Sequence, residues 1–232
     1  MANTQTSVPV FTSGQVLTAA QQNQINTGIP VFADSTARDA AFGGTGEKTL
    51  AEGQFAFLED TNATQFYDGS TWKGASSLTL INSTTISAQS TVTLSDVFSA
   101  TYHSYLLTLT NLSGTDSVLK ATLGTTATGY SWSGREWYYN VASADRRAVN
   151  TTYFETAFIK TNAGGSSLIY FQNPFLSVRS TFQTMMITPV SNPGAVQQQG
   201  FLDNTTSYTD IVFTMASGTF SGTITAYGLA QS

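Results

Sequence analysis

Cysteine is absent from this 232-residue chain, histidine occurs once, at position 103, and only 10% of the residues are charged. Without cysteine the chain can form no disulfide and offers no thiolate zinc ligand and no cysteine nucleophile. A single histidine adds too little for a zinc site of the usual kind. We therefore expect no metal and no cofactor.

Long apolar runs and clusters of basic residues are also missing. No stretch approaches the ~20 apolar residues of a membrane-spanning helix. The start "MANTQTSVPVF" has neither the basic residues nor the apolar run of a secretory signal. The net charge is −5, and the few Lys and Arg residues are too dispersed for phosphate recognition. We expect neither membrane insertion nor a nucleic-acid partner.

The residues that are abundant favour β structure. Hydrophobic residues make up 41% of the chain and aromatic residues 12%, and Thr, Ser, Gly, Asn and Gln dominate the remainder. β-Branched and aromatic side chains fit a pleated surface, while Gly, Asn and Ser supply turn geometry. The composition predicts a mainly β protein.

The distribution of charge suggests two parts. Residues 1–74 hold seven acidic and three basic residues, a net charge of −4, whereas the remainder has a net charge of −1. The length also suits a small module joined to a mid-sized domain. We predict an N-terminal α+β module over residues 1–74 and an antiparallel β-sandwich, resembling a jelly roll, over 75–232.

Two short helices and a hairpin are expected in the first part. Thr18 and Gln21 have the spacing of a capping box, which predicts a helix through about Ile25. The same spacing at Thr36 and Asp39 predicts a second short helix over 37–42. "QFAFLE", the turn "DTNA" and "TQFYD" then read as a β-hairpin.

The hairpin region is rich in rings that a two-stranded hairpin cannot enclose by itself. Alternation along the strand places Phe55 and Phe57 on one face, and Ala56 and Leu58 on the other. We expect the ring face to pack partly on the two helices and partly on a neighbouring chain. The rings assigned to this packing or interface are Phe55, Phe57, Phe66, Tyr67 and Trp72.

The second part reads as one short strand after another, separated by turn residues. Such a pattern is typical of an antiparallel sandwich or jelly roll. The predicted strands lie within residues 77–81, 90–98, 104–112, 117–123, 135–142, 152–161, 167–178, 182–190, 209–216 and 220–229.

Three N-terminal stretches together resemble a known module. "FTSGQVLTAAQQNQI", "VFADSTARDAAF" and "EGQFAFLEDTNATQFYDGSTW" look like the N-terminal module of many tailed-bacteriophage minor tail and tail-fibre proteins. The ending "GTFSGTITAYGLAQS" is similar to the last strand of β-sandwich domains in phage fibre and head-fibre proteins. The first resemblance covers about a third of the chain.

The resemblance implies a component on the exterior of the virion, on tail or capsid, that is often a homotrimer and docks through its N-terminal module. Its partners would be other copies of itself and other tail or capsid proteins. An alternative with the same fold is a capsid decoration protein or head fibre. We expect docking to use apolar residues of the first part: Val10, Phe11, Val16, Leu17, Ile25 and Phe32.

No catalytic constellation stands out, and we predict no enzyme. "GGTGEKT" lacks the lysine directly after the last glycine that a phosphate-binding loop requires. His103 could act as a catalytic base only beside a nucleophile, and the chain has no G-x-S-x-G motif to supply a serine nucleophile. Cleavage of a glycan requires two carboxylates on either side of the scissile bond. The candidate residues are scattered and form no known sequence motif: Glu136, Asp145, Glu155, Asp203 and Asp210.

Residues 129–147 are the most suggestive stretch for binding, because aromatic rings crowd around three arginines there. Flat rings beside polar donors suit recognition of a sugar or a protein. Trp132, Trp137 and Tyr139 are the candidate contacts to a host glycan or protein. The other interpretation, a core with a subunit interface, remains open.

Overall fold

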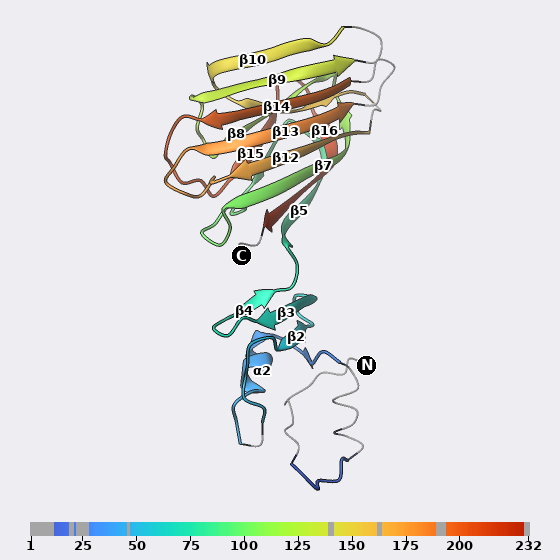
Figure 1. Ribbon diagram of the computed structural model, residues 1–232. Helices are drawn as coiled ribbons and strands as arrows, with labels where there is room; N and C mark the ends of the chain where they lie inside the picture. The colour runs from blue at the N-terminus through green and yellow to red at the C-terminus, as the bar shows by residue number, and fades with distance from the viewer. Residues whose placement is uncertain are drawn as a thin grey trace. The chain divides into compact units, whose positions relative to one another are not determined.

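The computed structural model describes residues 12–18, 21, 28–45, 47–138, 142–161, 164–188 and 194–229. The chain divides into two compact units, residues 1–77 and 78–232, which we call unit 1 and unit 2 (Figure 1). The eight-stranded sheet and one of the two four-stranded sheets belong to unit 2, and the fold is mainly β, as the composition predicts.

Unit 1 is a four-stranded sheet with one short helix. The sheet order is β1-β2-β3-β4, in which β1 runs parallel to β2 and the other pairs are antiparallel. The elements are β1 (Val31–Phe32), α2 (Ser35–Ala40), β2 (Phe55–Leu58), β3 (Ala63–Tyr67) and β4 (Trp72–Gly74). The predicted hairpin is therefore present as β2 and β3.

The two predicted helix starts have different outcomes. Thr18 and Gln21 do form the capping box, since the backbone N–H of Gln21 donates to Thr18 Oγ1 at 3.2 Å and the backbone N–H of Thr18 donates to Gln21 Oε1 at 3.0 Å. Gln21 is helical, and residues 22–27 lie outside the described residues. The second helix instead begins at Ser35, because Asp34 is its cap and accepts from Ala37 N–H at 2.8 Å.

The core of unit 1 lies on the face of the sheet opposite to the predicted one. Ala56 and Leu58 are buried with Phe32 and Ala41, and Phe42 and Trp72 pack against them. Arg38 on α2 covers this side, with its guanidinium 4.6 Å from the Trp72 ring centre and a hydrogen bond to Gln65.

The ring face of the sheet is left open by this arrangement. Phe55 is 44% exposed, and Phe57 and Phe66 are half-buried, with 6.3 Å between the Phe55 and Phe66 ring centres. The expected packing of these three rings on the second helix is wrong, because α2 packs on the other face, where Ala56 and Leu58 are buried. Most of the first predicted helix lies outside the described residues.

Unit 2 is a sandwich of an eight-stranded and a four-stranded antiparallel sheet. In sheet order, the larger sheet consists of β10 (Ala144–Thr151), β9 (Tyr130–Tyr138), β14 (Gly194–Leu202), β13 (Ser180–Thr188), β12 (Gly165–Gln172), β7 (Ser104–Gly114), β16 (Phe220–Leu229) and β5 (Leu78–Gln89). The smaller sheet consists of β11 (Phe154–Ile159), β8 (Ser117–Leu123), β15 (Ile211–Met215) and β6 (Thr91–Leu94). The division into eight and four strands differs from the eight-stranded jelly roll.

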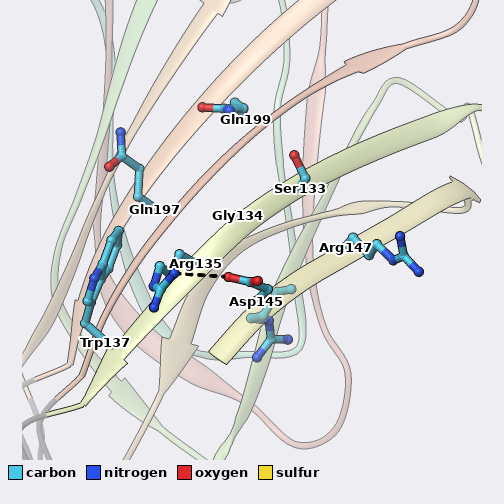
Figure 2. A pocket seen from close by; sticks show the side chains of 9 residues that line it. Ser133, Gly134, Arg135, Trp137, Asp145, Arg147, Gln197 and Gln199 are labelled. Carbon is cyan, nitrogen blue, oxygen red and sulfur yellow. Dashed lines mark ion pairs between the residues drawn. The ribbon is translucent and has the colours of Figure 1, made fainter. Parts of the chain in front are cut away.

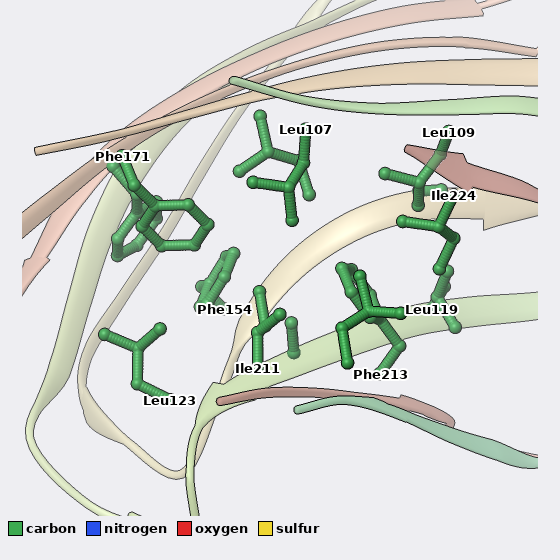
Figure 3. Packing of buried hydrophobic residues seen from close by; sticks show 14 of the residues in the cluster. Leu107, Leu109, Leu119, Leu123, Phe154, Phe171, Ile211, Phe213 and Ile224 are labelled. Carbon is green, nitrogen blue, oxygen red and sulfur yellow. The ribbon is translucent and has the colours of Figure 1, made fainter. Parts of the chain in front are cut away.

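The core of unit 2 fills the space between the two sheets (Figure 3). Phe154 of the smaller sheet stacks on Phe182 of the larger one, with 4.3 Å between ring centres, and meets Phe171 edge-on at 5.4 Å. Aromatic pairs of this kind add to the stabilisation from burial alone. They fix which face of the larger sheet is inward.

Two strands of the larger sheet were not among the predicted ones. β10 carries charges on both faces, and β14 turns Gln198 and Gly200 inward, so neither shows the alternation of apolar and polar residues that marks a half-buried strand. β9 also begins at Tyr130, five residues before the predicted start at 135.

Acid should weaken the turn between β3 and β4. The Asp68 carboxylate accepts from the backbone N–H groups of Thr71 and Ser70 at 2.7 and 2.9 Å, and from the Ser70 hydroxyl at 2.8 Å. These bonds, with a smaller attraction from Lys73, lower the pKa of Asp68 well below its usual value of 3.8. Because the pKa is depressed in the folded state, the stabilisation is present above pH 3.8 and disappears as the pH falls through the folded-state pKa.

We expect Asp68→Ala to lower the melting temperature of unit 1 at pH 6, and the difference from the native chain to shrink steadily below the usual Asp pKa of 3.8. Calorimetry of the full chain between neutral and strongly acidic pH measures this. Asp68→Asn is the matched control, because it keeps an acceptor oxygen but cannot ionise. A constant difference over the whole pH range would contradict the assignment.

Candidate functional site

A shallow groove crosses one edge of the larger sheet, on the face that points away from the core. It consists of two adjoining depressions of about 510 and 500 Å³ that share Ser133, Arg147 and Gln199. Ser133 pairs in register with Arg147 of β10 on one side and with Gln199 of β14 on the other. Figure 2 shows its short side chain between the two longer ones.

The groove exists because short side chains on β9 lie between long ones on both neighbouring strands. Ser131 and Ser133 form its floor, and alternate residues of a strand share one face. Phe201 of β14 faces Ser131 from one side, and Val149 of β10, 80% exposed, lines the groove on the other. A β-bulge between Ala148 and Thr151 disturbs the register of β10 at this point, and such bulges are frequent beside functional sites.

One end of the groove combines an aromatic ring with charged and amide groups. Trp137 is 44% exposed there, next to Arg135 and Gln197 (Figure 2). Arg135 pairs with Asp145 at 3.6 Å and donates to the Ser143 hydroxyl at 2.7 Å. An exposed ring next to planar donors can stack on a flat apolar ligand surface and hydrogen-bond its polar rim.

Arg147 is the cation of the groove that has no carboxylate partner among the described residues. The groove therefore has a small local excess of positive charge, from Arg135 and Arg147 against Asp145, in a chain of net charge −5. This arrangement can hold a ligand that carries hydroxyl or acidic groups.

β10 is an edge strand, and Arg146 fastens it to the other sheet. Its side chain points inward and donates to Glu155 of β11 at 2.8 and 2.9 Å, and to Glu136 of β9 at 3.3 Å. The guanidinium also lies 4.8 Å from the Phe158 ring centre. Gln198 donates to Glu155 at 3.1 Å, so β9, β10, β11 and β14 meet in one buried network.

Glu136 and Glu155 are therefore brought together by the fold, but with a guanidinium bound to both. Glu136 also accepts a hydrogen bond from Tyr138, and this bond, more than burial, raises the pKa of the Tyr138 hydroxyl. Both carboxylates belong to the inward network, whereas the groove opens on the opposite face of the sheet. Through Arg146, the two carboxylates join β10 to β9 and to β11 of the other sheet, which is a structural role.

The three candidate contact residues do not form one surface. Trp132 is 7% exposed, packs in the core, and donates its indole N–H to the Tyr153 carbonyl at 3.3 Å. Trp137 lies five positions further along β9, and an odd spacing places it on the opposite face. Tyr139 lies outside the described residues. We therefore keep Trp137 in the site and leave Trp132 in the core.

The predicted docking residues are also divided. Val16 and Leu17 are exposed, at 86% and 37%, whereas Phe32 is fully buried in the core of unit 1 and is unavailable to another molecule. Val10, Phe11 and Ile25 lie outside the described residues. Tyr67 and Trp72 pack against each other, with 5.6 Å between ring centres, and Trp72 contacts the core side of unit 1.

Within the described residues, no three His, Asp or Glu side chains come together as metal ligands, and no helix has the length and apolar character to cross a membrane. The sequence places Arg147 in the suggestive stretch 129–147 without marking it as a contact, and sequence reasoning missed Gln197 and Gln199; these residues lie on the two unrecognised strands, β10 and β14. The run "QQQ" offered one usable signal, because alternation puts Gln197 and Gln199 on the same face.

Comparison with protein-family models, curated proteins and solved structures found no match to this chain.

Removing the cation of the buried network should destabilise unit 2. Arg146→Met retains the length of the side chain but leaves two buried carboxylates without their partner, and we expect it to reduce the free energy of unfolding by about 3 kcal/mol or more. Arg135→Met is the matched control on the neighbouring strand. Its pair with Asp145 is exposed, so the loss should stay below about 1 kcal/mol. Denaturant unfolding measures both, and equal losses would contradict the structural role of Arg146.

Proposed function

We propose that this chain is a structural protein of a bacteriophage particle, of the minor tail or tail-fibre type. Unit 1 docks to the particle, and unit 2 is a β-sandwich head on the exterior whose groove contacts the host surface. The proposal includes no catalytic step and no cofactor.

The observation that carries the proposal is the incomplete core of unit 1. Its fully buried apolar residues, among those described, are Phe32, Ala41, Ala56 and Leu58. The opposite face of its sheet presents Phe55, Phe57 and Phe66, of which Phe55 is 44% exposed. A four-stranded sheet packed on a helix can fold by itself, so its second face is free to serve another purpose. Exposed apolar rings on that face favour docking on another molecule.

The resemblance found in the sequence supports the same assignment. Two of the three stretches that resemble the phage module, residues 31–42 and 52–72, contribute β1, α2 and β2 to β4, which form the sheet and helix of unit 1. They correspond to one folded unit and not to scattered parts of the chain. Phe55, Phe57 and Phe66, together with the exposed Val16 and Leu17, are the docking residues that we propose.

Incorporation into particles tests the docking role. A chain lacking residues 1–27 retains β1 and the buried Phe32, so unit 1 keeps its described core. We expect this truncation, and Phe55→Asp in the full chain, to reduce the amount of protein per purified particle by about tenfold or more, because buried apolar contacts are lost. The measurement is quantitative immunoblotting of particles against the major capsid protein.

The matched control for docking is Trp137→Ala, which changes unit 2 and should leave incorporation unchanged. Normal incorporation of the truncated chain and of Phe55→Asp would exclude unit 1 as the anchor. Labelling of intact particles for electron microscopy locates the protein on tail or capsid, and a capsid location would favour the decoration protein over the fibre.

Host adsorption tests the groove. Trp137→Ala and Arg147→Ala remove the exposed ring and the unpaired cation, and central aromatic and arginine contacts commonly contribute tenfold or more to affinity. We expect particles with both changes to adsorb at least about tenfold more slowly. Val178→Ala is the control, because Val178 is 47% exposed and does not line the groove. Unchanged adsorption with normal incorporation would remove the groove from the proposal.

A further inference from the structure

Six neighbouring strands of the larger sheet, β14 and the five that follow it, contain no charged residue. β13, β12, β7, β16 and β5 follow one another in the sheet, and none of them includes Asp, Glu, Lys or Arg. The charges of this sheet all lie on β9 and β10. In β13, β12, β7 and β16 alternate side chains point into the core and the others face away from it, whereas most of β5 is exposed. A face without charge is unusual for a surface that water covers.

Apolar side chains run across this uncharged face in register. Leu80 of β5 is opposite Tyr227 of β16, which is opposite Leu106 of β7, and Leu106 is opposite Tyr170 of β12. Leu80 is 58% exposed, and the other three are half-buried. Cross-strand neighbours of this kind lie within contact distance of each other.

A second row adjoins the first. Leu168, two residues before Tyr170 on the same face of β12, is opposite Met185 of β13, and Ile187 follows on the same face. These three side chains are 46%, 47% and 50% exposed. Together the two rows form one continuous patch, which we call the uncharged face: Leu80, Leu106, Leu168, Tyr170, Met185, Ile187 and Tyr227.

The uncharged face approaches the size of a standard subunit interface. Five strands at about 4.8 Å spacing and about seven residues at 3.3 Å each span roughly 24 by 23 Å. The accessible area of such a surface exceeds its flat area of roughly 550 Å², and it approaches the ~800 Å² per partner of a standard interface.

The polar side chains of the face indicate which partner it fits. Gln183, Thr108 and Thr225 lie among the apolar residues, and each of these side chains carries both a donor and an acceptor. A surface of this kind can satisfy its own hydrogen bonds when it meets a copy of itself. A charged face would instead require a partner of opposite charge, and nothing on this face selects one.

We propose that the uncharged face of unit 2 is the interface through which this chain binds a second copy of itself. The groove lies toward the charged edge of the same sheet, on β9, β10 and β14, and shares only β13 with the uncharged face, so it stays at the border of this contact. The inference does not depend on the proposed role in a phage particle.

Sedimentation of the purified full chain over a series of concentrations tests the interface. We expect the native chain to self-associate, and Met185→Glu to raise the dissociation constant by about tenfold or more, because a charge without a partner enters the contact. Met185→Lys should have the same effect.

Val178→Glu is the control, because it adds the same charge at an equally exposed apolar residue outside the uncharged face. Circular dichroism checks that each variant is folded. If Met185→Glu is not, Leu168→Thr replaces it, because threonine keeps the preference for β structure and removes most of the apolar contact.

Three results would overturn the inference. The native chain could remain monomeric at every concentration, whatever else the face binds. The Met185 variants could associate as well as the native chain. Association could instead be abolished by Phe55→Asp, which would place the contact on unit 1. A chain that associates through the uncharged face but is absent from particles would exclude the proposed function and leave this inference standing.

Discussion

In unit 2 a four-stranded sheet covers one face of an eight-stranded sheet, and this arrangement determines which side chains are buried and which are left at the surface. Every strand of the larger sheet directs alternate side chains to two faces, and the Phe154, Phe171 and Phe182 cluster buries one of them. The other face has no described layer of its own. The chemistry of this face changes across the sheet. It is uncharged and partly apolar on β5, β16, β7, β12 and β13, whereas the charged residues and the groove lie at the other edge, on β9 and β10.

The attachment of the edge strand β10 to the other sheet depends on the guanidinium of Arg146. β10 has a hydrogen-bonded neighbour on one side only, and Arg146 reaches inward from it to carboxylates on β9 and on the opposite sheet. The same strand presents Arg147 outward to the groove. Because neighbouring residues of a strand point to opposite faces, the pair Arg146 and Arg147 performs two separate tasks, one inside the sandwich and one on its surface.

Unit 1 illustrates the same constraint on a smaller scale. Its sheet also has one covered face, and the identity of that face is decided by close packing and not by the number of rings. Ala56 and Leu58 allow α2 to approach, while Arg38 and Trp72 close the side of the core. Phe55, Phe57 and Phe66 remain on the outer face, where another molecule can cover them.

The sequence by itself determined the β character, the strands with regular alternation, the hairpin over residues 54–68 and the capping box at Thr18 and Gln21, because these depend on local propensity and spacing. It did not reveal β10 and β14, since their inward positions hold Arg146, Gln198 and Gly200 in place of apolar residues. Only the tertiary structure decided that Trp132 is inside and Trp137 outside, and that Ser133 lies between Arg147 and Gln199. Register between strands far apart in the chain sets those neighbours, and no local pattern specifies it.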